Sequence, residues 1–429
     1  MLFDRYDNSL STLSSKARDF YITGVDGLLS AAAGTEEALH AAVAADDDFV
    51  LAHCALARLQ QVTGRAVDAR ATMQTAGTLA DVQRDRLSGR ELAHVQALTL
   101  LTDGNVSEAY PFIRAHVRHY PRDVLLAQTC TSVFGLIGFS GQPGREAEQL
   151  AYTESLLAHY GDDWWLLCQH AFALCETGQH DRALAAIDKS LHINPDSAHS
   201  VHIRAHIYYE TGEVAAGAKY LEEWMQHYDK KALLHCHLSW HVALWALEQG
   251  EPDKMWQVID EDLMPDGAWG PALNVLTDSA AILYRAMLAG VPVPTHYWHT
   301  LSDYALQYFP TPGLAFADVH AALTHAMAGE SSPLQAILHE AKGPAAEVVH
   351  DLAGGFEAIA REEWAVASQH LIAGMADHAR IGGSRAQRDL LEFALTNTLL
   401  RQGEQKQAQQ LLALRRPIQA TSKAATSLH

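Results

Sequence analysis

The sequence has very few signals for β-strands. No long alternating run of Val, Ile and Thr is present, and no Asn-Gly turn joins two alternating segments. Ala, Leu, Glu, Gln and Arg are frequent instead, and apolar residues recur at helical spacing, as in residues 51–59. The chain is therefore expected to be all-α.

Long apolar runs and an excess of basic charge are also missing. No apolar stretch approaches the ~20 residues that a membrane helix needs, and residues 1–7 do not read as a secretory signal. Lys and Arg number 31 against 51 Asp and Glu, a formal net charge of −20. Because nucleic-acid phosphates and anionic membranes attract clustered Lys and Arg, neither is expected as a partner.

Cysteine is scarce, and the sequence has no CxxC pair. The five cysteines are scattered along the chain: Cys54, Cys130, Cys168, Cys175 and Cys236. Such a set is typical of buried, reduced thiols in a cytoplasmic protein.

Common catalytic motifs are absent as well. There is no P-loop, GxGxxG, HExxH or GxSxG segment. Nucleotide hydrolases, dehydrogenases and zinc proteases are therefore disfavoured, and no nucleotide cofactor is expected. Hydrolases and lyases of less familiar types stay open.

Helix-breaking residues recur at a spacing that indicates repeats. Between residues 163 and 195, two helical stripes of apolar residues flank Gly178, and Asn194-Pro195 ends the second stripe. Gly212 follows Gly178 by 34 positions, within a similar Glu-Thr-Gly turn. This is the period of the tetratricopeptide helix pair. Weaker pairs are expected at roughly 47–80, 85–120, 121–160, 274–310, 312–342, 346–380 and 384–416.

These pairs predict a tetratricopeptide-like helix-pair solenoid, a right-handed superhelix that can close on itself. The expected organisation is N-terminal helical repeats at 1–160, central repeats with His-rich first helices at 161–263, a Pro- and Gly-rich loop at 264–271, C-terminal repeats at 272–417 and a tail at 418–429.

Histidine is abundant, with 25 residues in the chain. His202/His206 and His237/His241 are i,i+4 pairs on the first helices of two successive repeats. First helices of a stack lie side by side, so these four imidazoles are expected to form one wall, where a divalent ion such as Zn, Fe, Mn or Ni is a candidate cofactor. Each His pair taken alone fits an ordinary structural role at least as well as it fits a binding or catalytic role.

Further polar and aromatic residues extend this candidate site. Asp318 and His320 form an Asp-x-His segment, and a His–Asp pair in a dry pocket performs acid–base chemistry near neutral pH. His241, His237, Asp318 and His320 are thus candidate catalytic residues. Trp240 and Tyr208 neighbour the His pairs and are candidates for lining a pocket. Several other histidines are expected at the surface or at helix ends: His53, His116, His119, His170, His180, His325 and His378.

Several separated segments resemble the tetratricopeptide repeat protein 38-like family. They are residues 200–207, 236–244, 276–285, 316–320 and 382–389, the last reading Gly-Gly-Ser-Arg-Ala-Gln-Arg-Asp. The matching positions are His202, His206, His237, Trp240, His241, Asp278, Arg285, Asp318, His320, Gln387, Arg388 and Asp389. The chain departs from the family at Tyr208, where another His is usual, at Leu238-Ser239, and at Ala317, where Asn is usual. The resemblance implies the repeat fold and carries no settled activity.

The last matching segment has two interpretations. Arg388 and Asp389 are candidate ligand-binding residues if late helices approach the His wall, with Arg388 clamping an anion. Equally, they are a buried pair that ties the C-terminal helices to the body.

Two functions follow from these patterns. The leading hypothesis is a helical-repeat protein that binds a small polar or anionic ligand in a His-rich concave pocket, lined by the four histidines with Asp318 and His320. Acid–base or metal-assisted hydrolase or lyase activity is an extension that the sequence leaves open. The alternative is a tetratricopeptide scaffold that binds a protein or peptide partner without catalysis.

Overall fold

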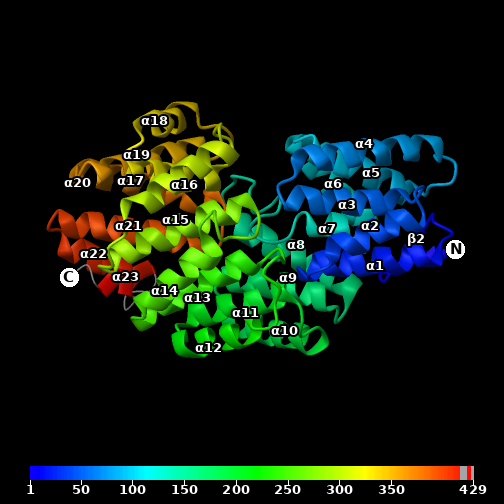
Figure 1. Cartoon of the computed structure of the whole chain (residues 1–429), viewed down its shortest axis with the longest axis horizontal. Helices are drawn as coiled ribbons and strands as arrows, with labels where there is room; N and C mark the ends of the chain where they lie inside the picture. Colours follow the sequence, from blue (N-terminus) through cyan, green and yellow to red (C-terminus); the bar gives the residue numbers. More distant parts are fainter. Residues whose placement is uncertain (416–422, 427–429) are drawn as a thin grey trace. The chain divides into compact units, whose positions relative to one another are not determined.

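The computed structural model describes residues 1–415 and 423–426, and its regular structure is almost entirely helical (Figure 1). Strand structure in these residues is a two-residue antiparallel ladder of β1 (Leu2–Phe3) and β2 (Ser9–Leu10). Contacts divide the chain into two compact units. Unit 1 comprises Met1–Ile137, Gln149–Ala173 and Ala185–Val201, and unit 2 comprises Gly138–Glu148, Leu174–Leu184 and the described residues from His202 onward.

Unit 1 is built from successive helix pairs. Its helices are α1 (Ser15–Ser30), α2 (Thr35–Ala45), α3 (Val50–Val62), α4 (Ala66–Val82), α5 (Gly89–Thr102), α6 (Val106–His119) and α7 (Val124–Gln128). α1 packs on α2, α3 on α4 and α5 on α6. A Cβ at Gly24 would overlap the Leu39 side chain, so this glycine allows α1 to approach α2 closely. A capping box between Ser88 and Glu91 starts α5.

The next helices contribute residues to both units. They are α8 (Arg145–Tyr160), α9 (Trp164–Glu176), α10 (His180–Ile193) and α11 (Ala198–Thr211). Gly178 and Gly212, which follow α9 and α11, have φ angles of 77° and 74°. This left-handed conformation favours glycine and ends each helix in the same way, as the repeated turn sequence predicts.

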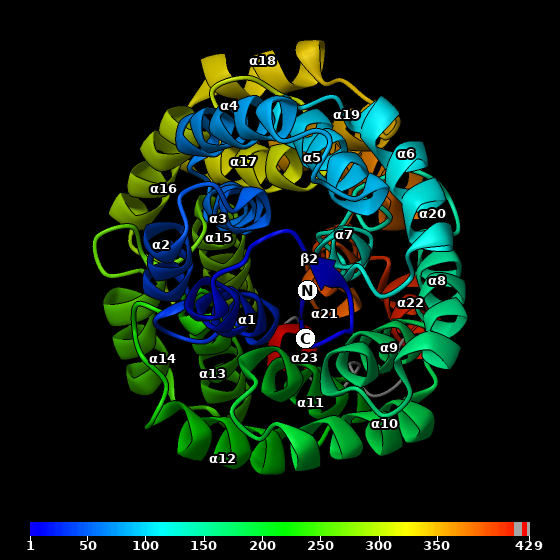
Figure 2. The same cartoon turned by 90° about the vertical axis from the view of Figure 1, so that its right-hand side faces the viewer.

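Unit 2 continues the series of pairs. Its remaining elements are α12 (Val214–Met225), α13 (His235–Gln249), α14 (Pro252–Val258), the π-helical turn η1 (Ile259–Leu263), α15 (Ala272–Leu288), α16 (Thr295–Tyr308), α17 (Ala315–Ala328), α18 (Ser331–Glu340), α19 (Ala346–Ala360), α20 (Trp364–Ala376), the 3-10 turn η2 (His378–Ile381), α21 (Arg385–Arg401), α22 (Gln405–Arg415) and α23 (Lys423–Thr426). α13 packs on α15, α15 on α17 and α21, and α17 on α19. Figure 2 shows the same elements from a second direction.

The central helices of unit 2 are buried on all sides. Every residue of α13 from His235 to Leu247 is buried, and α15, α17 and α21 have similarly long buried runs. A helix buried all round is normally apolar all round. Here it carries histidines, aspartates and arginines, and buried polar groups must find partners inside the protein.

The expected all-α fold of tetratricopeptide-like helix pairs is confirmed. The pairs expected at 274–310, 312–342 and 346–380 correspond to α15/α16, α17/α18 and α19/α20. Within the described residues, every helix is too short or too polar to cross a bilayer. Of the tail expected at 418–429, residues 418–422 and 427–429 lie outside the described residues, and 423–426 form α23.

Candidate metal centre

Two helices bring four histidines together in unit 2. His202 and His206 lie one turn apart on α11, and His237 and His241 one turn apart on α13. One ring nitrogen from each of the four lies within 4.8 Å of the others, and all four side chains are buried. The wall of imidazoles expected from the i,i+4 pairs is therefore present as a compact cluster.

The shortest contacts converge on one atom. His202 Nε2 lies 2.8 Å from His206 Nε2 and 2.9 Å from His237 Nε2. An imidazole nitrogen has a single in-plane position, which holds either a proton or a lone pair. A proton on His202 Nε2 therefore serves only one of the two contacts, whereas a cation among the nitrogens attracts a lone pair from each ring.

Burial keeps two of these rings neutral. It lowers the pKa of His206 to about 3, with the nearby His237 adding to the effect. Burial also holds the pKa of His241 well below its usual value, with further lowering by His206, His237 and Arg285. Neutral imidazoles are the form that binds metal ions.

His241 is the least satisfied member of the cluster. Its side chain is fully buried, and neither of its ring nitrogens has a hydrogen-bond partner in the described part of the chain. Its ring lies edge-on to Trp240, with centroids 4.9 Å apart. A buried imidazole without any partner is costly, and a bound cation would remove that cost.

A carboxylate on the neighbouring helix orients His237. Asp278 on α15 accepts a hydrogen bond from His237 Nδ1 at 2.7 Å, so that Nε2 presents its lone pair to the other rings. Asn274 Nδ2 and Gln387 Nε2 also donate to Asp278, at 3.3 Å and 3.4 Å. A histidine that donates its second N–H to a supported carboxylate is the usual arrangement around a protein-bound metal.

Trp240 closes one side of the cluster, as its position next to the His pairs suggests. Its ring stacks on His237 with centroids 5.4 Å apart and planes 16° from parallel. The Tyr208 hydroxyl accepts a hydrogen bond from Arg204, and its ring packs on Tyr220. The neighbouring Tyr209 accepts from Arg285 and donates to Asp389 at 2.8 Å.

Asp318 and His320 have separate backbone hydrogen-bond partners. Asp318 accepts a hydrogen bond from Gly313 N at 3.0 Å, and among the described residues no hydrogen bond joins it to an imidazole of the cluster. His320 Nδ1 donates to Phe316 O at 2.7 Å. Burial lowers the pKa of His320 to about 4, and its Nε2 has no hydrogen-bond partner in the described part of the chain.

Arg388 and Asp389 lie in separate networks at the start of α21. Arg388 pairs with Glu146 and donates to Gly383 O, and it lies 4.0 Å from Glu176. These partners take the two terminal nitrogens of the guanidinium, and Arg388 Nε has no hydrogen-bond partner in the described part of the chain. Burial raises the pKa of Glu176 to about 7 despite the neighbouring Arg388.

The residues that complete the centre were only partly indicated by sequence. Asp278 and Gln387 occur among the positions that match the family, but nothing in the sequence assigned them a role. No sequence pattern indicated that Asn274 belongs to the centre. In unit 1, His116 and His94 both contact the buried Asp123, at 2.9 Å and 3.0 Å; His116 lies in the last turn of α6, in line with the expected surface or helix-end position.

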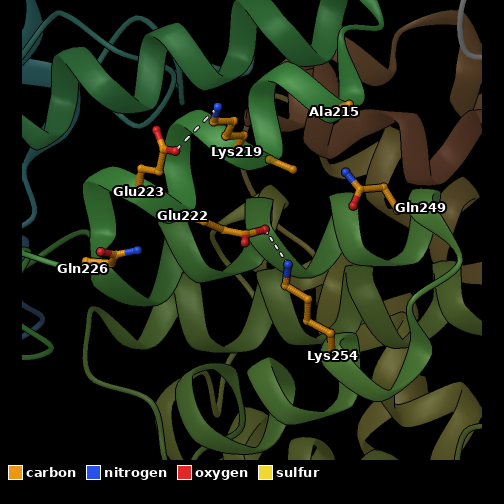
Figure 3. A pocket seen from close by; sticks show the side chains of 8 residues that line it. Ala215, Lys219, Glu222, Glu223, Gln226, Gln249 and Lys254 are labelled. Carbon is orange, nitrogen blue, oxygen red and sulfur yellow. Dashed lines mark hydrogen bonds and ion pairs between the residues drawn. The ribbon is translucent and has the colours of Figure 1, made fainter.

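A surface pocket of about 300 Å³ lies elsewhere in unit 2 (Figure 3). It is lined by Ala215, Ala218, Lys219, Glu222, Glu223, Gln226, Gln249 and Lys254. Its charged groups pair with one another, as Lys254 does with Glu222 at 2.6 Å. None of the residues selected from the sequence lines it.

Known proteins give only a distant likeness. No protein-family model matches the chain. Human IFIT1, solved as a dimer with m7Gppp-AAAA, is 14% identical with a TM-score of 0.47, covering 99% of this chain and 95% of its own. Yeast Tom70 is 14% identical with a TM-score of 0.35, covering 95% and 86%. These scores carry no conclusion about function. The chain is a tetratricopeptide-like helical-repeat protein with a buried four-histidine cluster.

Proposed function

We propose that this chain is a metal-binding helical-repeat protein, in which His202, His206, His237 and His241 hold one divalent transition-metal ion. The convergence of His206 Nε2 and His237 Nε2 on His202 Nε2 carries the proposal. A tetrahedral ion with bonds of ~2.0–2.1 Å places its donors about 3.3 Å apart. The observed contacts of 2.8 and 2.9 Å and the widest separation of 4.8 Å bracket that value.

The donor set favours particular ions. Neutral imidazoles suit Zn, Fe, Ni and Cu, whereas Mg and Ca prefer carboxylate and carbonyl oxygens. Four protein donors fill a tetrahedral shell, which is the pattern of structural rather than catalytic zinc sites. The ion would then fix α11 against α13. A more specific proposal is that the ion assists hydrolysis or elimination of a small polar ligand. This chemistry needs an open coordination position, so one imidazole would have to leave the ion.

Elemental analysis of tag-free protein tests the proposal. We expect about one equivalent of a transition metal, retained through dialysis, because the preformed site binds without a folding cost. His241→Asn should lose the metal. His325→Asn is the matched control, since His325 is a buried histidine in unit 2 that contacts Ser302 and lies outside the cluster.

Cobalt binding to the wild-type protein keeps this test independent of variant folding. Co²⁺ in a four-imidazole site should give the intense visible absorption of tetrahedral cobalt. The proposal is wrong if the wild-type protein binds neither Zn²⁺ nor Co²⁺, or if His241→Asn binds both as well as the wild type does.

An interaction scaffold is the second candidate, and the repeat architecture favours it because stacked helix pairs expose long continuous surfaces. The scaffold would bind a protein or peptide partner. The five buried free cysteines fit a reducing compartment such as the cytoplasm. The formal net charge of −20 disfavours a nucleic acid as the partner. A stoichiometric partner that co-purifies equally with wild type and His237→Ala would support a scaffold that acts without the ion.

A further inference from the structure

Gln387 lies where the start of α21 meets the metal centre. It is the third residue of the helix and is buried. In the capping box of α21, Gln387 N donates to Ser384 Oγ at 3.2 Å, and Gln387 Oε1 accepts from Ser384 N at 3.0 Å. Its Nε2 donates to Asp278 Oδ1. One side chain therefore joins the helix cap to the carboxylate beside the histidines.

The two ends of this amide are not interchangeable. Ser384 N is a donor, so the amide end facing it must be the oxygen. The amino end then faces Asp278, whose carboxylate only accepts. Each end meets a partner of the opposite kind, so the hydrogen-bond network fixes the orientation of the amide.

We propose that Gln387 is a positioning residue of the metal centre, which by donating to Asp278 holds that carboxylate against His237 Nδ1. Asp278 has donors on both oxygens, with His237 and Asn274 at Oδ2 and Gln387 at Oδ1. Loss of the Oδ1 donor frees the carboxylate to rotate, and His237 Nε2 then loses its fixed direction. The inference rests on the proposed function, since it concerns the same ion.

The start of α21 is anchored firmly enough to act as such a support. Arg385 N donates to Glu176 Oε2 at 2.9 Å, and Arg145 donates to Gly383 O at 2.6 Å. Because these contacts fix the segment before α21, Gln387 presents its amide to Asp278 from a rigid position. The affinity of the ion should therefore depend on residues more than a hundred positions away from its ligands.

Gln387→Glu separates the two roles of this residue. Glutamate is a usual third residue in a capping box, so the cap survives. A carboxylate facing Asp278 removes the N–H donor of Gln387 and places two negative charges side by side. Ser384→Ala is the matched control, because it weakens the cap and leaves the Asp278 donor in place.

Zn²⁺ affinity is measured by chelator competition on the full chain at neutral pH. We expect Gln387→Glu to bind about 10- to 100-fold more weakly than wild type, as outer-shell changes usually do. The visible absorption of bound Co²⁺ should also change in Gln387→Glu, because His237 loses its fixed direction, and it should stay unchanged in Ser384→Ala. Ser384→Ala should keep wild-type affinity.

Equal Zn²⁺ affinity of Gln387→Glu and wild type overturns the inference. So does an equal loss in Ser384→Ala, because the effect would then come from the cap. If Gln387→Glu does not fold, Gln387→Met is compared with Ser384→Ala, and the same two outcomes apply. A wild-type protein that binds no Zn²⁺ would refute the proposed function itself, so the two failures are distinguishable.

Discussion

Asp278 on α15 and Asp318 on α17 are both buried, and they have different hydrogen-bond partners. Sequence patterns selected Asp318 to orient an imidazole, because it lies two residues from His320. The structure gives that role to Asp278, which contacts His237 from α15, and leaves Asp318 accepting from a backbone N–H. Neighbours along a helix point in different directions, whereas residues on packed helices meet. His170 was expected at the surface or at a helix end, and it is buried within α9 beside Thr153.

Asp318 should make stability depend on pH. Burial raises its pKa to about 6, above the unfolded value near 3.8. The folded protein therefore binds the proton more tightly, and the contribution of this group to stability is present below about pH 4 and is lost as pH rises to 6. Asp318→Asn removes the buried charge and keeps an oxygen for Gly313 N.

We therefore expect Asp318→Asn to be more stable than wild type by roughly 1–3 kcal/mol above pH 6, with the difference vanishing below pH 4. Urea unfolding at a series of pH values measures it. A difference between the two proteins that does not change with pH would contradict this assignment.

At the level of elements, a short glycine segment sets the start of α21. Gly382 and Gly383 have φ angles of 100° and 74°, in the region that favours glycine. A Cβ at Gly383 would overlap the Phe316 ring of α17, and one at Gly382 would overlap Phe139. The chain thus passes tightly between aromatic side chains before Ser384 caps the helix that carries Gln387.

Gly383→Ala should lower the unfolding free energy of the protein by roughly 1–3 kcal/mol, from backbone strain together with the clash against Phe316. Gly403→Ala is the matched control, because Gly403 has a φ angle of 84° and no atom within 4 Å of the place that an added methyl group would take. Chemical denaturation compares the two. Equal losses would show that the Phe316 contact contributes nothing.

At the scale of the whole molecule, the proposed ion belongs to one of two compact units. All four histidines, Asp278 and Gln387 lie in unit 2. A ligand that binds only the folded state stabilises it by mass action, by ~2.7 kcal/mol at a free concentration 100 times its Kd. Unit 1 has its own buried polar cluster, in which Arg90, His94 and His116 pair with Asp123.

Metal binding should therefore slow hydrogen exchange in unit 2 and leave unit 1 unchanged. Exchange measured by mass spectrometry, with and without Zn²⁺, should show the largest protection in α13, α15 and the start of α21. Peptides from α1 to α6 are the internal control. Equal protection in both units would show that the ion stabilises the chain without acting through this centre.

The sequence by itself determined the helical-repeat fold and the composition of the candidate centre. The 34-residue spacing from Gly178 to Gly212 indicated helix pairs, and the i,i+4 histidines indicated two imidazoles on one face of each first helix. These are local properties, set by helix geometry over a few residues. Only the tertiary structure decided which carboxylate meets His237, that Arg388 pairs with Glu146, and that Gln387 reaches Asp278. Those contacts join segments 41 to 242 positions apart, and their formation depends on how helices pack, which no local pattern records.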